Sequence, residues 1–346
     1  MDDSRNGTLL EVEDLKTHFY LEEGVLKAVD GVNLNVRKGT TFGIVGESGC
    51  GKSITALSIL RILLQNSKHE GGSIKLHVPA ERSPSGEESV LELDKMHSQS
   101  EEIRRVRGNL ISMIFQEPMS ALSPVHTVGD QLMEIARLHL GQSEEEARET
   151  SIDLLKRVGI SAPVQRMQEY PHQLSGGMAQ RVMTAMALIG NPLLLIADEP
   201  TTALDVTVQA QILELMQDLQ AQYGMSIIFI THDLGVIAQM ADEVAVMYLG
   251  HIVEYADIDS LFYRPAHPYT RALMQAIPRP ELGKSVRLSA IPGRVPQPIN
   301  MPKACPFVDR CPYNIPGTCD KRMPAEYQVE EGHWTRCFLY DPEVNR

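Results

Sequence analysis

The residues whose types and spacing could do chemistry begin with GESGCGKS, a stretch that starts at Gly46. An apolar, β-rich run at residues 41–45 precedes it, and a helix-like pattern follows. Gly46 and Gly51 let the backbone turn its N–H groups toward a phosphate, and the helix N-terminus adds the positive end of its dipole. Lys52 is suited to reach the β- and γ-phosphates of a nucleotide, and Ser53 to bind Mg²⁺. The stretch therefore predicts a nucleotide-binding loop.

The residues inside this loop complete the predicted nucleotide contacts, namely Glu47, Ser48, Gly49 and Cys50. We interpret Cys50 as a small residue that fills the loop and not as a nucleophile. A chance glycine turn before a helix is the alternative interpretation, and the full spacing in a strand–turn–helix context disfavours it.

Two adjacent carboxylates follow an apolar run in LLLIADEP, at residues 193–200. Residues 193–197 are expected to form a buried parallel strand, whose carboxyl end is where α/β sheets bind ligands. Asp198 is then suited to hold Mg²⁺, and Glu199 to orient and polarise an attacking water. Without the glycine-rich loop, two solvated carboxylates would be the ordinary interpretation. With it, the pair predicts nucleotide hydrolysis.

A second candidate phosphate site lies in YPHQLSGGMAQ. Ser175, Gly176 and Gly177 open a helix that is expected to run to about Ile189, with Gly190 as its C-terminal cap. A Ser-Gly-Gly helix start offers N–H groups and a hydroxyl to an anion. One chain has no obvious use for two phosphate cradles on one nucleotide, unless the second serves a nucleotide held by a neighbouring chain. The pattern therefore predicts a head-to-tail dimer.

Together these motifs resemble those of the ATP-binding subunits of ABC transporters. GESGCGKS is similar to the Walker A motif, LLLIADE to the Walker B motif and LSGGMAQ to the ABC signature. The resemblance covers residues 8–260. It implies an α/β fold with a RecA-like core and an antiparallel β subdomain in an ATPase domain at residues 1–255, and a helical subdomain at about residues 125–190.

The resemblance also implies further site residues. Gln116 in MIFQEP resembles the Q-loop glutamine, which would assist catalysis and bind Mg²⁺ together with Ser53 and Asp198. His232 in FITHD resembles the catalytic switch histidine, which can donate to the γ-phosphate. The remaining positions are the D-loop, Ala203-Leu204-Asp205, with Asp205 near the nucleotide, and an aromatic residue for adenine, Phe19 or Tyr20.

The order of elements explains why these side chains would meet. His232 follows an expected strand at residues 226–231, and Gln116 follows one at residues 111–115, so both would reach the sheet edge that carries Glu199. In the stretch expected to form the helical subdomain, Ser143 and Glu146 predict a capping box and a helix ending near Val158 and Gly159. Residues 79–102 resemble a solvated insertion without assigned function.

Composition limits the possible partners. With 32 Lys and Arg against 45 Asp and Glu, the chain carries a formal charge of −13, which argues against nonspecific attraction to nucleic acid. No apolar run approaches the ~20 residues of a membrane-spanning helix. The acidic start MDDSRNGTLLEVEDL lacks the order of a secretory signal, so we expect the chain to remain in the cytosol, where stable disulfides are disfavoured.

The chain changes character after about residue 255, because eleven of its 21 prolines fall within residues 265–316. So many prolines predict an extended appendage, not helices or central strands. Within it, RPAHPYTRALMQAIP and IPGRVPQP resemble the C-terminal extension of the oligopeptide and dipeptide branch of ABC importers. Residues 256–346 are therefore expected to form that extension.

Four cysteines crowd into this extension with the spacing C-x5-C-x7-C-x17-C, and disulfides among them are disfavoured in the cytosol. Their clustering suggests a bound metal, but a close C-x2-4-C pair typical of zinc is lacking, and the spacing differs from ferredoxin patterns. The resemblance to the oligopeptide branch implies a structural [4Fe-4S] cluster, with Zn²⁺ as the alternative and no part in hydrolysis. Its ligands would be Cys305, Cys311, Cys319 and Cys337.

Two function classes follow. The first is an ATPase that powers import of peptides, working with a paralogous ATPase, two transmembrane permease subunits and an extracytoplasmic binding protein at the cytoplasmic face of the membrane. Cargoes carried by relatives in this branch, such as oligosaccharides, opines or nickel chelates, stay open. The second is a soluble ABC ATPase acting on nucleic acid through a zinc module. Residues 301–346 carry six basic and seven acidic residues. Their net charge of −1 predicts no basic surface that could bind the phosphates of a nucleic acid.

Overall fold

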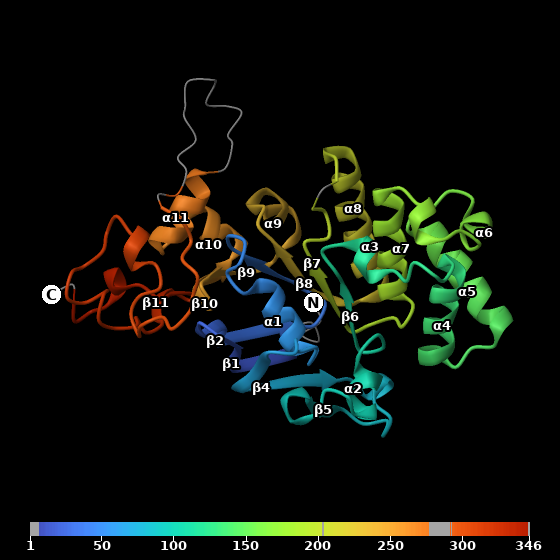
Figure 1. Cartoon of the computed structure of the whole chain (residues 1–346), viewed down its shortest axis with the longest axis horizontal. Helices are drawn as coiled ribbons and strands as arrows, with labels where there is room; N and C mark the ends of the chain where they lie inside the picture. The colour runs from blue at the N-terminus through green and yellow to red at the C-terminus, as the bar shows by residue number, and fades with distance from the viewer. Residues whose placement is uncertain (1–6, 203, 277–290, 292, 345–346) are drawn as a thin grey trace. The chain divides into compact units, whose positions relative to one another are not determined.

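The computed structural model describes residues 7–202, 204–276, 291 and 293–344 (Figure 1). The D-loop residue Ala203 and part of the proline-rich stretch, residues 277–290 and 292, lie outside the described residues. The chain divides into two compact units. Unit 1 contains residues 1–9, 36–40 and 95–230, and unit 2 contains residues 10–35, 41–94 and 231–346.

Unit 1 is built on three parallel strands, with β7 between β6 and β8. The strands are β6 (Ile111–Ile114), β7 (Leu194–Asp198) and β8 (Ser226–Thr231). Every residue of β7 and β8 is buried. A parallel strand covered on both faces needs no polar face, and this is why both appear in the sequence as unbroken apolar runs. All three expected strands are confirmed to within one residue.

The helices of unit 1 include a group, α4 to α7, whose members lie beside one another (Figure 1). The capping box expected at Ser143 is present, because the Glu146 carboxylate accepts from the Ser143 N–H at 2.8 Å and Ser143 Oγ accepts from the Glu146 N–H at 3.3 Å. The helices are α2 (Glu101–Val106), α3 (Pro118–Ala121), α4 (Val128–Leu140), α5 (Glu144–Arg157), α6 (Pro163–Arg166), α7 (Gly176–Leu188) and α8 (Val206–Tyr223).

Gly190 does not cap α7 in the way we expected. Its φ is not positive, and the next residue, Asn191, takes the left-handed conformation with φ 49°. Glycine is needed at 190 because a Cβ there would collide with the backbone carbonyl of Gly108. The residue type was therefore informative, but it marked a close approach of two backbone segments instead of a helix end.

Unit 2 contains an antiparallel sheet in the order β2-β1-β4-β5. Its strands are β1 (Thr8–Leu21), β2 (Gly24–Arg37), β4 (Ser67–Val78) and β5 (Ser89–Glu92). In the register of β1 with β4, Leu10 lies opposite Leu76 and Val12 opposite Ile74, all four buried. Residues 79–102 are therefore not simply a solvated insertion, because residues 89–92 pair with β4 as an edge strand.

The glycine-rich loop follows a strand of a second sheet in unit 2, which there has the order β11-β12-β10-β9-β3. The strands are β3 (Thr41–Val45), β9 (Glu243–Tyr248), β10 (His251–Asp257), β11 (Tyr327–Glu330) and β12 (His333–Thr335). β3 runs parallel to β9, and β10 runs antiparallel to both β9 and β12. The C-terminal region thus extends the sheet that carries the loop.

The expectation of an extended appendage after residue 255 is wrong for the described residues. Two helices, α10 (Ile258–Tyr263) and α11 (Pro268–Gln275), begin the region, and β11 and β12 pair with the sheet. Pro268 is accommodated at the first turn of α11, where its missing N–H costs no hydrogen bond. His267 caps that helix, since its Nδ1 accepts from the Tyr269 N–H at 3.0 Å. The other helices of unit 2 are α1 (Lys52–Ile59) and α9 (Leu234–Met240).

Glu254 on β10 holds the extension to the sheet and is fully buried. Its carboxylate accepts from the N–H groups of Ala266 at 2.6 Å and His267 at 2.8 Å, and lies 2.8 Å from Nε2 of buried His333. Burial alone would lower the pKa of His333, but the hydrogen bond and charge of Glu254 outweigh it, so the pKa is raised. This pair therefore stabilises the fold most when His333 is protonated.

We expect Glu254→Gln to lower the free energy of unfolding by about 3 kcal/mol, because it removes one partner of a buried ion pair. His333 has a raised pKa in the folded chain, so its contribution is present below about pH 6.5 and is lost as the pH rises through the folded value. Thermal unfolding from pH 6 to 9 should show this fall in the native chain and a flatter profile in Glu254→Gln. Identical profiles would contradict the assignment.

Candidate nucleotide site and four-cysteine site

The glycine-rich loop joins β3 to α1 and is shaped by close backbone contacts. Gly46 and Gly51 have φ of 158° and 107°. A Cβ at Gly51 would collide with the Ala28 carbonyl, and one at Gly46 with the Met247 carbonyl. Glycine is required at both positions for these approaches, Gly51 also for its left-handed backbone, and the loop can then present its N–H groups to an anion.

Lys52, Ser53 and Cys50 take distinct places around this loop. Lys52 and Ser53 are the first residues of α1, and the buried Lys52 ammonium donates to the carbonyls of Gly46 at 2.8 Å and Glu47 at 3.1 Å. Cys50 is buried, and burial raises the pKa of its thiol, so it remains a neutral thiol at physiological pH. This environment agrees with the interpretation of Cys50 as a filling residue.

The carboxylates of unit 1 lie at the end of β7, as predicted. Asp198 is the last residue of the strand and Glu199 follows it, both buried. Gln116 follows β6 and donates from Nε2 to the Glu199 carboxylate at 3.1 Å, so the structure brings these two predicted residues together. Glu199 has φ 47°, a conformation that non-glycine residues rarely adopt and that often marks a functional position.

Thr202 is a contact of Glu199 that the sequence reasoning missed. Its hydroxyl donates to the Glu199 carboxylate at 2.8 Å, on the same oxygen that Gln116 contacts. The two donors fix the direction of the carboxylate. The available signal was the pair of threonines in DEPTT, which only Pro200 separates from the two acidic residues.

The signature residues begin α7 in unit 1, with Ser175 as the N-cap. Ser175 Oγ accepts from the Met178 N–H at 3.3 Å, and Ser175 and Gly176 are exposed. A Cβ at Gly176 would have no neighbour within 4 Å, and one at Gly177 would only touch Val208. The helix start is therefore open to a ligand or partner from outside. Asp205 instead caps α8, accepting from the Thr207 and Val208 N–H groups at 3.0 Å each.

The remaining candidates lie in unit 2. His232 follows β8 and is exposed. Of the two aromatic candidates on β1, Tyr20 is already engaged, since its hydroxyl donates to Glu70 at 2.7 Å and Lys68 lies 5.1 Å over its ring. Phe19 is half-buried and faces the opposite side of the strand, so Phe19 is the better candidate for adenine.

The four cysteines of the extension line one small cavity together with the side chains of Phe307, Ile315 and Phe338. Cys305, Cys319 and Cys337 are buried, and all four are free thiols. The Cys305 N–H donates to the Cys319 carbonyl at 2.9 Å, and the Ile315 N–H points to Cys319 Sγ at 3.3 Å. Residues separated by up to 32 positions therefore converge on one apolar site.

In this buried environment the protonated thiol is favoured over the thiolate at Cys305 and Cys337. Burial, reinforced by the neighbouring cysteines, raises the pKa of Cys305 to about 12 and of Cys337 to about 11, so thiolates there need a compensating cation. Among the described residues, no three His, Cys, Asp or Glu side chains are arranged around one metal ion. Zinc would need its four sulfurs about 2.3 Å from one centre. The arrangement of the described residues therefore adds no support for a bound metal, and the [4Fe-4S] cluster stays a prediction.

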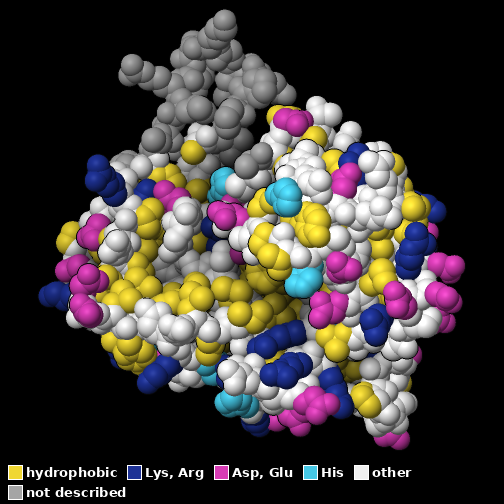
Figure 2. Space-filling model, turned by 45° about the vertical axis from the view of Figure 1, so that its right-hand side comes forward, with side chains coloured by type: hydrophobic (Ala, Val, Ile, Leu, Met, Phe, Trp, Pro, Cys, Tyr) yellow, Lys and Arg dark blue, Asp and Glu magenta, His cyan; other side chains and the backbone are white. Residues whose placement is uncertain are grey.

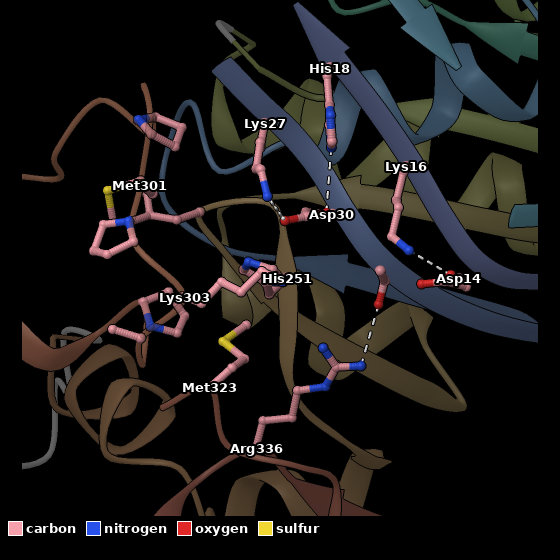
Figure 3. Close-up of a pocket in the computed structure, with 16 residues that line it drawn as sticks. Asp14, Lys16, His18, Lys27, Asp30, His251, Met301, Lys303, Met323 and Arg336 are labelled. Atoms are coloured by element: carbon pink, nitrogen blue, oxygen red, sulfur yellow. Dashed lines mark hydrogen bonds and ion pairs between the residues drawn. The ribbon is translucent and has the colours of Figure 1, made fainter. Parts of the chain in front are cut away.

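Unit 2 also contains a pocket of about 440 Å³ between β1, β2 and the extension (Figure 3). Its two carboxylates are paired, Asp14 with Lys16 at 2.6 Å and Asp30 with Lys27 at 3.0 Å. Met301 and Met323 line it from the extension. None of the motif residues lines this pocket, so it is distinct from the nucleotide loop.

Comparisons with known proteins identify the class. The family model for ABC transporters matches residues 29–202, and the model for the C-terminal region of oligopeptide/dipeptide transporters matches residues 253–319. A solved bacterial ABC transporter cassette, the dimeric MJ0796, superposes with a TM-score of 0.62 at 24% identity, over 72% of this chain and 99% of the cassette. The chain is an ABC-type ATPase.

Full-length relatives narrow the assignment. A probable peptide ABC transporter ATP-binding protein of Sinorhizobium fredii, y4tR, is 50% identical over 97% of this chain and 96% of its own length. The oligopeptide transport ATP-binding protein AppD of Bacillus subtilis is 48% identical over 97% of this chain and 98% of its own length. This chain belongs to the family of ATP-binding proteins of peptide ABC transporters.

The surface and helices bear on possible partners. On the face shown in Figure 2, Lys and Arg side chains are interspersed with Asp and Glu and do not form one continuous basic surface. With the net charge of −13, this gives no support to the nucleic-acid alternative. In the part of the chain that the structure describes, no helix is long and apolar enough to cross a membrane.

Proposed function

We propose that this chain is the ATP-hydrolysing subunit of a peptide importer, acting from the cytoplasmic face of the membrane. The observation that carries the proposal is the combination, in one chain, of the ABC motif set with the C-terminal region of oligopeptide/dipeptide transporters. The names of the full-length relatives support the same cargo class. Residues 1–255 would form the ATPase domain, with the helical subdomain at about 125–190, and residues 256–346 the extension.

The proposed chemistry assigns a role to each motif residue. Lys52 neutralises phosphate charge, and the hydroxyl, carboxylate and amide oxygens of Ser53, Asp198 and Gln116 are the hard ligands that suit Mg²⁺. Glu199 polarises the attacking water, held in direction by Gln116 and Thr202. His232 donates to the γ-phosphate. The other predicted nucleotide contacts are Phe19, Gly46, Glu47, Ser48, Gly49, Cys50 and Gly51.

The signature and D-loop support a proposed dimer. The open helix start at Ser175, Gly176 and Gly177 would bind ATP held by a second cassette, next to Asp205. We infer a paralogous ATPase as that partner, with two permease subunits and an extracytoplasmic binding protein completing the importer. ATP closes the two cassettes and hydrolysis reopens them, which alternates access through the permeases.

We also propose that the extension binds a [4Fe-4S] cluster through Cys305, Cys311, Cys319 and Cys337, with Zn²⁺ the less favoured alternative. The convergence of the four thiols on one apolar cavity supports it. When bound, the cluster would supply iron–thiolate bonds that link distant parts of a short, proline-rich region.

A reconstituted complex tests the proposed function. In proteoliposomes that contain this chain, its partner ATPase and the permeases, a peptide-loaded binding protein should stimulate ATP hydrolysis and peptide uptake. The isolated chain should be a poor ATPase, since it lacks the partner's signature residues. Stimulation by an oligosaccharide or a nickel chelate, with none by peptides, would reassign the cargo. Vigorous hydrolysis by the demonstrably monomeric chain would contradict the dimer.

A further inference from the structure

Glu47, the second residue of the nucleotide loop, is held by two residues of the extension. Its backbone N–H donates to the Tyr269 hydroxyl at 2.9 Å. Its carboxylate accepts two N–H groups of the Arg310 guanidinium, at 2.6 and 3.1 Å. We propose that Tyr269 and Arg310 are positioning residues of the nucleotide loop, and that the four-cysteine site sets ATP affinity through them.

The Arg310 contact is built to fix a direction. The guanidinium is buried, with 4% of the side chain exposed, and binds the carboxylate through both arms. One arm also lies 3.3 Å from the Tyr248 hydroxyl. Two-point, charge-assisted contacts of this kind are among the stronger hydrogen bonds in proteins and define an orientation as well as a distance. Glu47 therefore has one preferred side-chain position.

Tyr269 is equally constrained by its neighbours. It is fully buried and packs against the rings of Tyr248, at 4.7 Å between centroids, and Phe307, at 5.3 Å. Phe307 also meets Tyr248 edge-on at 5.2 Å. Offset and edge contacts between three buried rings resist rotation of any one of them. The hydroxyl that accepts from Glu47 is thus held by Phe307, a residue of the cysteine region.

Both contacts depend on the segment between two cysteines. Phe307 and Arg310 lie between Cys305 and Cys311, in a short turn. Two backbone hydrogen bonds close this turn. The Val308 N–H donates to the Cys305 carbonyl at 3.1 Å, and the Arg310 N–H donates to the Phe307 carbonyl at 3.1 Å. Any group that holds Cys305 and Cys311 also fixes the ends of this turn. Releasing the cysteines would free Arg310 and Phe307 to move, and the support of Glu47 would weaken.

Glu47 connects this support to the phosphate-binding groups. Its own carbonyl accepts from the Lys52 ammonium at 3.1 Å, so a change in the Glu47 peptide units displaces the lysine and its neighbouring N–H groups. A loop that is already held in its binding conformation loses less conformational entropy when it binds a ligand, so binding is more favourable. The extension should therefore raise ATP affinity without touching the reacting atoms.

Arg310→Met tests the proposal in the full-length chain, because it keeps length and apolar packing but removes both hydrogen bonds to Glu47, together with the contact to the Tyr248 hydroxyl. ATP affinity is measured by titration with a fluorescent ATP analogue, beside iron and sulfide content and the melting temperature. We expect affinity about tenfold weaker, which corresponds to about 1.4 kcal/mol. In the reconstituted complex, KM for ATP should rise while kcat at saturating ATP changes little. Arg294→Met, an exposed arginine of the same extension, is the matched control and should match the native chain.

Two further variants separate positioning from general damage. If Arg310 acts through Glu47, Glu47→Gln combined with Arg310→Met should weaken ATP binding no more than the stronger single substitution. Cys311→Ser should lose iron and weaken ATP binding in the same direction. Native ATP affinity in a folded Arg310→Met chain would overturn the proposal, as would additive effects in the double variant. If Arg310→Met does not fold, Tyr269→Phe is measured instead, because it removes only the hydroxyl. Weaker ATP binding by that variant would support the proposal, and native affinity would overturn it. These titrations require no permease, so they stand apart from the test of peptide import.

Discussion

Glu199→Gln should retain ATP binding and lower the rate of hydrolysis by at least about a hundredfold in the assembled complex, the lower end of what a positioned general base contributes. Glutamine preserves the shape of the side chain and can still meet Gln116 and Thr202. It removes the negative charge that polarises water. Binding and turnover should therefore separate, with ATP titration giving a near-native affinity and single-turnover assays giving almost no phosphate release.

Two comparisons make this result specific. Lys52→Ala should show the opposite pattern, with weak ATP binding, because it removes a buried cation of the loop. Glu214→Gln, which replaces an exposed glutamate on α8, should leave both quantities unchanged. Hydrolysis at the native rate by the Glu199→Gln complex would show that another group activates the water.

The sequence predicted the strands and helices that short, local residue patterns define. β3, β7 and β8 were recognisable because parallel strands buried on both faces must be apolar throughout, and α5 because Ser143 and Glu146 satisfy each other's N–H groups. The order of the strands then placed Gln116 beside Glu199, as the structure has it. Local composition and strand topology were sufficient for this half of the site.

The contacts that the sequence could not predict join residues far apart in the chain. Arg310 and Glu47 are 263 positions apart, and nothing around either residue indicates the other. The same holds for Glu254 with His333, whose pairing depends on β12 lying beside β10. The number of prolines led to the wrong prediction that the region after residue 255 is extended. Pro268 begins a helix, and the described prolines after residue 290 lie in the loops between the helices and strands of this region. Proline excludes positions within an element, and not the element itself.

Cys319→Ser should abolish metal binding in the extension, the second large effect that we expect. The native chain, purified without oxygen, should be brown and contain about four iron and four acid-labile sulfide per chain. Cys319 makes the central contacts of the site, through its carbonyl to the Cys305 N–H and its sulfur to the Ile315 N–H. Serine offers a hard oxygen in place of a soft thiolate, so both iron and sulfide should be lost together.

Cys50→Ser is the matched control, since Cys50 is the one cysteine outside the extension and lies buried in the nucleotide loop. Iron and sulfide should stay at the native level in that variant, whatever it does to ATP binding. Colourless native protein that holds one zinc per chain would overturn the cluster assignment and favour the alternative. The metal analysis thus decides whether a [4Fe-4S] cluster or Zn²⁺ supplies the positive charge that these thiolates need. Burial raises the pKa of the Cys305, Cys311 and Cys337 thiols, so these become stable ligands only when a cation replaces their protons.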